Sequence, residues 1–234
     1  MGRIYAGTSG WAYSRWKPGF YPPTLRTSAF LAYYATRLNS VEVNYTFRQF
    51  PTPELLRSWS DATPPDFKFA VKAHQSITHF KRLRAAAKPA REFFASLKIL
   101  RETKKLGPIL FQLPPNFKCD LRVLKNFLAR LPPGLQVAFE FRHESWFNKD
   151  TYGLLHRARV ALCQAESEKL VTPDVNVTNF SYLRLRKDGY SPRALEEIRK
   201  KVKRLARRGD VFLYFKHEDT PDGALHAEKL LRGI

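Results

Sequence analysis

The sequence has little of several features that identify common classes of protein. Its 234 residues include only two cysteines, Cys119 and Cys163, which are too few for a disulfide framework. No apolar run approaches the length of a membrane-spanning helix. Residues 1–10 lack the apolar centre of a signal peptide and begin a strand-like pattern instead. We therefore expect a cytoplasmic protein with no membrane partner.

The sequence also lacks the spacings that mark common catalytic and cofactor sites. Gly7-Thr8-Ser9-Gly10 is not followed by the Gly-Lys-Ser/Thr ending of a phosphate-binding loop, and no Gly-x-Ser-x-Gly turn occurs. The sequence contains neither the His-x-His nor the His-Glu-x-x-His spacing that is typical of metal sites. We expect no cofactor. A divalent metal stays open as the weaker alternative, with candidate ligands His74, His79, His143, Glu166, His217, Glu218 and Asp219.

What the sequence has in excess is positive charge. Lys and Arg number 41 against 21 Asp and Glu, a net charge of +20. Much of this excess falls in residues 81–105 and in residues 184–208. A basic surface attracts nucleic acid by counterion release, and it also keeps a protein soluble. Both interpretations stay open, and the candidate nucleic-acid contacts are Lys200, Lys201, Lys203 and Arg204.

Strand-like and helix-like segments alternate along the whole chain, and no linker divides it. This alternation predicts an α/β fold, a compact single-domain (β/α)8 TIM barrel over residues 1–234. Residues 166–179 predict an irregular connection with at most a weak helix. The predicted strands are Ile4–Ser9, Val41–Tyr45, Phe67–Ala73, Pro108–Leu113, Gln136–Arg142, Val160–Ala165, Phe180–Leu185 and Val211–Phe215. The predicted helices are Ser28–Leu38, Pro53–Ser60, Pro89–Lys105, Leu121–Arg130 (capped by Asp120), Lys149–Arg157, Pro192–Arg208 and Ala224–Leu231.

Within the strands, apolar and polar side chains alternate with a period of two. In residues 41–44, for example, the two valines lie on one face and Glu42 and Asn44 on the other. Since the apolar face must meet the helices, the polar side chains are expected to point into the barrel. They concentrate toward the C-terminal ends of the strands, where barrel enzymes build active sites. The structural alternative is a self-neutralising network in which the lumen charges pair: Glu42 or Glu140 with Lys72, Arg142 or Arg184.

Basic side chains outnumber acidic ones on these faces, which favours a small anionic or phosphorylated ligand. Two facing carboxylates suit acid–base chemistry, although the nearby cations favour ionised carboxylates and make a glycoside hydrolase the weaker interpretation. The candidate catalytic residues are Glu140, Glu42, His79 and His143. The candidate ligand contacts are Asn44, Lys72, Gln112, Arg142, Tyr182 and Arg184. Trp11 and Trp146 could stack on a base or sugar, or could instead form a hydrophobic plug.

Six motifs occur in order over nearly the whole chain: Gly7–Trp11, Val41–Phe47, Phe67–Ala73, Ile77–His79, Leu106–Pro115 and Glu140–Trp146. Together they resemble the family named domain of unknown function 72, also called YecE-like. The resemblance implies a TIM barrel and supplies no reaction. The sequence departs from that family at Arg186-Lys187, where His-Gly is frequent, and at Lys216-His217, where paired Asn is frequent. These two strand ends are expected to recognise a different ligand.

Two functions remain open at this point. The first is an enzyme, a hydrolase of a phosphorylated or nucleic-acid-like substrate that binds at the C-terminal face of the barrel. The second is a non-catalytic nucleic-acid-binding protein that uses its basic outer helices.

Overall fold

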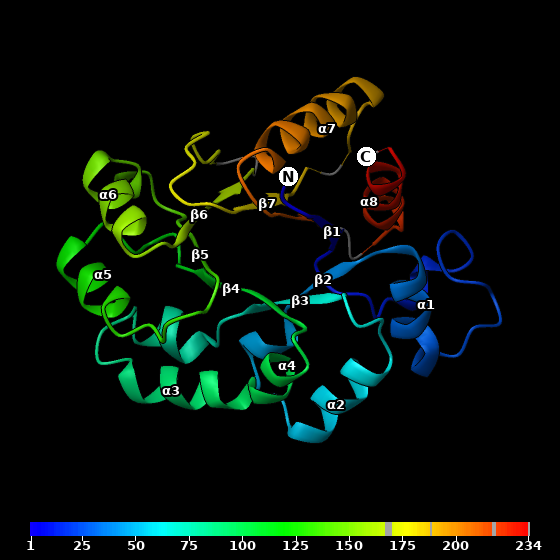
Figure 1. Ribbon diagram of the computed structural model, residues 1–234, viewed down its shortest axis with the longest axis horizontal. Coiled ribbons are helices and arrows are strands. Elements are labelled where there is room, and N and C mark those ends of the chain that lie inside the picture. The colour runs from blue at the N-terminus through cyan, green and yellow to red at the C-terminus, as the bar shows by residue number, and fades with distance from the viewer. Residues whose placement is uncertain (167–169, 188, 217–218, 234) are drawn as a thin grey trace.

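A barrel of parallel strands surrounded by helices forms the protein (Figure 1). The computed structural model describes residues 1–166, 170–187, 189–216 and 219–233, and all statements below concern these residues. The strands are β1 (Ile4–Thr8), β2 (Ser40–Val43), β3 (Lys68–Lys72), β4 (Leu106–Gln112), β5 (Val137–Glu140), β6 (Ala161–Ala165), β7 (Ser181–Leu185) and β8 (Val211–Phe215). The helices are α1 (Phe30–Arg37), α2 (Pro53–Asp61), α3 (Ala87–Ser96), α4 (Lys98–Glu102), α5 (Leu121–Leu128), α6 (Lys149–Arg157), α7 (Pro192–Ala206) and α8 (Asp222–Arg232).

The strands follow the order β1-β8-β7-β6-β5-β4-β3-β2, with β1 and β2 as the two ends of the sheet. Ser9 and Glu42 form a bridge between these ends, and the Gly10 amide donates to the Glu42 carbonyl at 2.9 Å. A Cβ atom on Gly7 would lie 1.9 Å from the Ser40 carbonyl oxygen, so only glycine permits this approach of β1 to β2. The barrel is thereby nearly closed, and the predicted (β/α)8 TIM barrel is confirmed.

Several helices begin where the sequence provides a capping side chain. The predicted cap Asp120 accepts a hydrogen bond from the Val123 amide at 3.0 Å, and Ser191 caps α7 in the same way. The predicted helix over residues 89–105 is instead two helices, α3 and α4, separated at the fully buried Leu97. Residues 170–179 contain no helix, in agreement with the predicted irregular connection. Among the described helices, none is long and apolar enough to cross a membrane.

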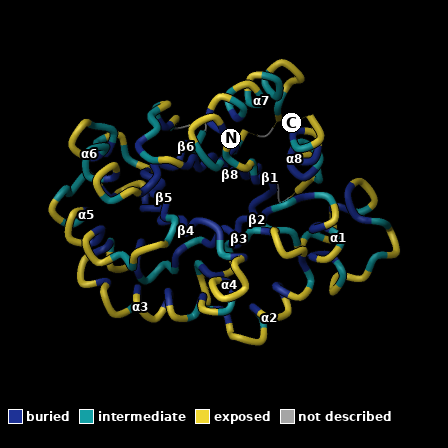
Figure 2. The backbone as a smooth tube through the Cα atoms, in the orientation of Figure 1, coloured by how far each residue is buried: buried dark blue, intermediate teal, exposed yellow. Residues whose placement is uncertain are grey.

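The apolar side chains occupy two layers. The larger layer lies between the sheet and the helices, where the inner helix faces are buried and the outer faces are exposed (Figure 2). The smaller layer fills the barrel itself, where Tyr5 stacks on Phe212 with ring centroids 4.6 Å apart beside Leu110 and Phe180. This plug closes the barrel below and leaves the polar side chains at its C-terminal end.

Candidate functional site

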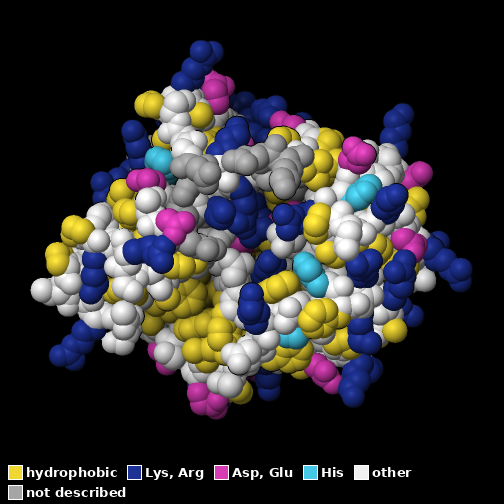
Figure 3. Space-filling view, turned by 180° about the vertical axis from the view of Figure 1, so that it is seen from behind, with side chains coloured by type: hydrophobic (Ala, Val, Ile, Leu, Met, Phe, Trp, Pro, Cys, Tyr) yellow, Lys and Arg dark blue, Asp and Glu magenta, His cyan; other side chains and the backbone are white. Residues whose placement is uncertain are grey.

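A cavity of about 890 Å³ opens at the C-terminal ends of the strands. Figure 3 shows Lys and Arg side chains gathered around a hollow in the middle of one face. Six of the described residues that line the cavity are basic, namely Arg48, Lys72, Arg142, Arg184, Arg186 and Lys216. Two described lining residues are acidic, namely Glu140 and Glu166. The walls therefore carry a clear excess of positive charge at the position where TIM barrels bind ligands.

The floor of the cavity is an ion cluster centred on Arg184, which is only 1% exposed. Its Nη2 lies 2.7 Å from Oε1 of Glu42, and its Nη1 lies 2.6 Å from Oε2 of Glu140. One guanidinium thus joins two carboxylates from strands β2 and β5. We call these three side chains the floor network. It realises the paired-charge alternative that the sequence left open, with one cation shared between two carboxylates.

Glu42 has no oxygen left for a ligand. Besides Arg184, its carboxylate accepts hydrogen bonds from Ser9 Oγ and from the Tyr182 hydroxyl, both at 2.7 Å, and the residue is completely buried. Tyr182 is also buried, and burial raises the pKa of its phenol well above the ordinary value. Neither side chain lines the cavity. The geometry therefore argues against the predicted catalytic role of Glu42 and the predicted ligand contact of Tyr182. Both side chains are buried beneath the cavity surface and hydrogen-bonded to each other.

Glu140 does reach the cavity, although it is only 5% exposed. Its second oxygen accepts a hydrogen bond from Gln112 Nε2 at 2.8 Å. Gln112 lines the cavity as well, and it orients Glu140 as much as it could orient a ligand. Of the two predicted catalytic carboxylates, Glu140 is the one that a ligand could touch.

The other basic lining residues differ from Arg184 in their partners. Within the described parts of the chain, no carboxylate lies at ion-pair distance from Arg48, Lys72, Arg142 or Lys216. We call these four residues the mouth cations. Arg186 is intermediate, since its Nη2 lies 3.9 Å from Oε1 of Glu42. No described carboxylate therefore neutralises the mouth cations by direct contact.

Lys72 has the most perturbed environment of the mouth cations. Its Nζ lies 4.1 Å from the centre of the Phe47 ring, a cation–π arrangement. Burial lowers the pKa of Lys72 to about 8, and the charges of Arg184 and Arg142 act in the same direction. A shift of this kind is typical of lysines at functional sites.

The two predicted proton carriers differ in position. His79 packs edge-on against Phe47 with ring centroids 4.9 Å apart, and burial, followed by the charge of Lys72, lowers its pKa. His79 therefore lies beside the cavity in surroundings that favour its neutral form. His143 lies outside the cavity wall, where its Nδ1 accepts the Ser145 amide and caps a short turn. A proton-shuttle role for His143 finds no support in this geometry.

The segment after β3 has an unusual backbone. His79 belongs to a π-helical turn over Ser76–Phe80. Arg82, Leu83 and Ala85 follow with φ angles of 45°, 66° and 48°, in the left-handed region that non-glycine residues rarely adopt. Strained loops and π-helical turns cluster at ligand sites, because local folding alone would not select them. This segment follows β3 and lies beside the cavity through the contact of His79 with Phe47.

Asn44 and Arg48 come from the connection that follows β2, and both line the cavity. The Oδ1 atom of Asn44 is buried and accepts no hydrogen bond from the described residues. Buried polar atoms normally have a partner, so this oxygen is a natural contact for a ligand or a water. The sequence interpretation named Asn44 as a ligand contact and Glu166 as a candidate metal ligand, but it missed Arg48 and Phe47 as lining residues. Their position in loops after strand ends was the signal that could have identified them.

The two predicted aromatic contacts do not line the cavity. Trp146 is completely buried, stacks on Phe141 at 4.6 Å and donates from Nε1 to the Phe117 carbonyl at 2.7 Å. Its predicted ligand contact finds no support in this geometry, because the side chain is completely buried and its N–H is used in the core. Trp11 packs edge-on against Trp59 at 5.3 Å and belongs to the hydrophobic plug of the first loop.

The candidate metal ligands do not converge in the described structure. Within residues 1–166, 170–187, 189–216 and 219–233, no group of three or more His, Cys, Asp or Glu side chains could hold a metal ion. His217 and Glu218, two of the candidates, lie outside the described residues. The weaker metal interpretation thus gains no support from the remaining candidates.

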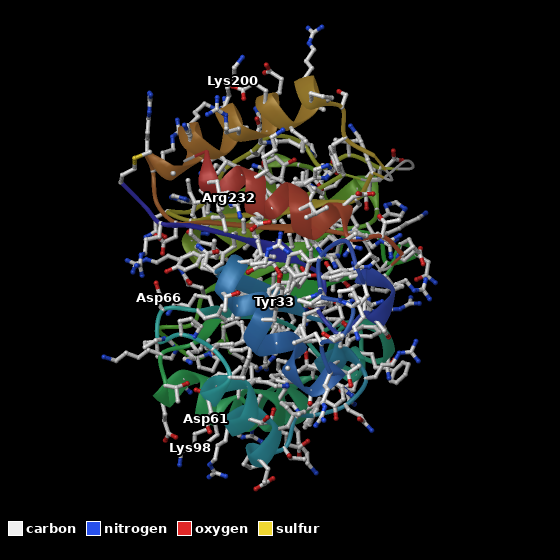
Figure 4. The ribbon with its side chains drawn as sticks, turned by 90° about the vertical axis from the view of Figure 1, so that its right-hand side faces the viewer. Tyr33, Asp61, Asp66, Lys98, Lys200 and Arg232 are labelled. Atoms are coloured by element: carbon white, nitrogen blue, oxygen red, sulfur yellow. The ribbon has the colours of Figure 1, made fainter. Side chains whose placement is uncertain are left out.

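The predicted nucleic-acid contacts lie on α7, with Lys200 at the outer surface of the molecule (Figure 4). Each contact has a local partner. Lys200 pairs with Glu197 at 2.9 Å, and Lys201 and Arg204 pair with Asp174 at 3.3 and 3.0 Å. Lys203 donates to the Gly233 carbonyl at 3.1 Å. Much of the charge of α7 is therefore balanced locally.

The barrel and its basic cavity define a class, a TIM-barrel protein with a polar cavity at the C-terminal face. The family model described as "Protein of unknown function DUF72" matches residues 5–233, and the chain belongs to that family, as the sequence motifs suggested. The solved structure of a DUF72 family protein from Thermotoga maritima MSB8 has a TM-score of 0.86 and 27% identity, and the alignment covers 99% of this chain and 98% of that one.

Two curated relatives are similar over part of their length. UPF0759 protein YunF of Bacillus subtilis is 30% identical over 159 residues, which cover 64% of this chain and 54% of the relative. UPF0759 protein YecE of Escherichia coli K12 is 32% identical over 148 residues, which cover 62% and 51%. The chain thus spans about half the length of the curated relatives that it matches.

Proposed function

We propose that the cavity binds a small anionic ligand, in the first instance a phosphate ester, and that this binding is the function of the barrel. The observation that carries the proposal is the contrast within the cavity. The floor network already neutralises Arg184, whereas the mouth cations have no carboxylate partners among the described residues. Several like charges facing one cavity repel each other, and an anion relieves that repulsion.

The chemistry of the lining residues supports a phosphorylated ligand. Arg48 and Arg142 carry planar guanidinium groups that match phosphate with two parallel hydrogen bonds. The unpartnered Oδ1 of Asn44 suits a ligand hydroxyl, which would donate to it. A volume of about 890 Å³ falls within the range of small-molecule sites.

Hydrolysis of such a ligand stays a prediction. Glu140 is positioned to touch it, and its ties to Arg184 and Gln112 make it an acceptor rather than a donor. A hydrolase that uses Glu140 as a base should lose turnover in Glu140→Gln while phosphate still binds.

Nucleic-acid binding by α7 also stays a prediction. It should vanish when Lys200, Lys201, Lys203 and Arg204 are neutralised together.

Calorimetric titration with inorganic phosphate at low salt tests the proposal. Arg142→Ala should weaken phosphate binding about tenfold or more, the cost of one charge-assisted hydrogen bond. Arg122→Ala removes the same charge from an exposed position on α5, outside the cavity, and should leave the affinity unchanged within about twofold. Equal affinities of these two variants would refute the proposal, as would an affinity of the unmodified protein too weak to measure.

A further inference from the structure

Lys72 differs from an ordinary anion-binding lysine. It ends β3 and lines the cavity, and its Nζ faces the Phe47 ring at 4.1 Å rather than a carboxylate of the described residues. A lysine whose ammonium is held in place usually has acceptors around it. Lys105 is the comparison within this chain, because its buried Nζ donates to the Ser60 carbonyl and to the carbonyl and hydroxyl of Thr63. The Lys105 amine has three described acceptors, whereas no described atom accepts a hydrogen bond from the Lys72 amine, which lies over the Phe47 ring.

The charges around Lys72 come from several elements. Arg184 on β7 and Arg142 after β5 disfavour its ammonium form, and Glu42 on β2 and Glu140 on β5 favour it. Both carboxylates are already bound to Arg184, so their effect is shared. With burial as the largest cause, the pKa falls to about 8. Roughly a tenth of the lysine is then neutral at pH 7, compared with less than a thousandth for an exposed lysine.

A desolvated lysine beside other cations is a nucleophilic amine. We propose that Lys72 forms an imine with the aldehyde or ketone carbonyl of an anionic ligand held by the mouth cations, an inference that rests on the proposed function. The substrate class is thereby narrowed to phosphorylated carbonyl compounds. The imine would hold such a ligand covalently and activate the carbon next to the former carbonyl.

The step balances with one proton taken from solvent. The neutral Nζ attacks the carbonyl carbon, the C–N bond forms, and the carbonyl π electrons move to the oxygen, which takes up a proton from solvent. The nitrogen then releases a proton, the oxygen takes up that proton as its second, and the C–O bond breaks. Water leaves and a protonated C=N bond remains. His79 packs against the same Phe47 ring, and its lowered pKa favours the neutral imidazole that can carry the proton from Nζ to the oxygen.

The probe is pyridoxal 5′-phosphate, a phosphorylated aldehyde, followed by borohydride, whose hydride reduces an imine to a stable secondary amine. Peptide mass mapping then identifies the modified lysines. We expect Lys72 to be modified faster than exposed lysines such as Lys88 and Lys98, and inorganic phosphate should slow that reaction at least threefold. Its rate should rise about fivefold from pH 7 to 8 and level off above pH 9, whereas exposed lysines gain about tenfold per pH unit.

Two variants provide matched controls. Lys72→Arg keeps a positive charge but cannot form an imine, so it should lose the modification. Lys88→Arg makes the same change at an exposed lysine outside the cavity and should keep the modification of Lys72. Thermal unfolding of both variants shows whether they fold. Lys72→Met is the second substitution if Lys72→Arg does not fold, and it should also lose the modification.

The outcomes separate the two proposals. If phosphate binds but Lys72 is not modified, the imine is refuted and anion binding stands. Pyridoxal, which lacks the phosphate, is the matched aldehyde. If both aldehydes modify Lys72 at equal rates and phosphate does not compete, the reactive lysine stands and the anion site is refuted. If phosphate does not bind and Lys72 stays unmodified, both proposals are refuted.

Discussion

The floor network and the mouth cations contain the same kinds of side chain in opposite electrostatic situations. Arg184 is buried and holds two carboxylates within 2.7 Å, whereas Arg142 is exposed and has no described carboxylate at ion-pair distance. The two arginines come from strand ends on the same face of the barrel. The comparison teaches that a charged side chain at a barrel mouth serves stability or ligand binding according to its partners, which the sequence does not state.

Removing Arg184 should produce the largest effect. Arg184→Met leaves Glu42 and Glu140 buried without their shared counter-charge, so the free energy of unfolding should fall by about 3–5 kcal/mol. Urea denaturation at pH 7 measures this change. Adding Glu140→Gln removes one of the two stranded charges and should restore about 1 kcal/mol. A loss below about 1 kcal/mol for Arg184→Met would mean that the floor is not a structural network.

The affinity of the mouth cations for an anion should depend moderately on pH. Sulfate keeps its charge from pH 6 to 10, whereas Lys72 loses its proton as pH rises through about 8. Sulfate affinity should therefore be full below pH 7 and fall about threefold to tenfold by pH 9. Titration of Lys72→Arg, which stays charged, should show little of this loss. An equal loss in Lys72→Arg would assign the pH dependence to another group.

The paired cations of α7 should produce the smallest effect. Arg204 is exposed, and its pair with Asp174 at 3.0 Å lies at the surface. Arg204→Ala should lower the free energy of unfolding by less than about 1 kcal/mol and leave phosphate affinity unchanged. Denaturation and calorimetry of the variant check both expectations. A tenfold loss of phosphate affinity would move the anion site from the cavity to α7.

Much of the fold could be predicted because the signals are local. Apolar runs, often with a period of two, located all eight described strands, and Asp120 and Pro53 marked helix starts correctly. The break between α3 and α4 was missed. Residues 89–105 lack an internal proline or glycine, and the break at Leu97 occurs where that residue turns into the core.

The site was harder to predict because its partners are distant in sequence. The sequence pattern assigned Glu42 and Glu140 to the inner face of the barrel. It could not show that the guanidinium of Arg184 reaches both carboxylates, because that depends on the stagger of the strands. The same holds for Trp146, whose burial depends on Phe117 and Phe141. Lys72 was predicted as a ligand contact, but the sequence pattern did not predict its cation–π contact with Phe47. A periodic sequence pattern indicates on which face of a strand a side chain lies. Only the tertiary structure shows how far that side chain is from partners on other strands.

The contacts of Glu42 also have a consequence for the order in which the chain matures. Its partner Ser9 precedes it by 33 residues, but Tyr182 and Arg184 follow it by 140 and 142. Because the chain is synthesised from the N-terminus, Glu42 is made long before β7, the strand that carries Tyr182 and Arg184. Until then, Glu42 lacks the hydrogen bond and the ion pair that β7 provides. The surroundings of this buried carboxylate are thus completed by a strand made about 140 residues after it.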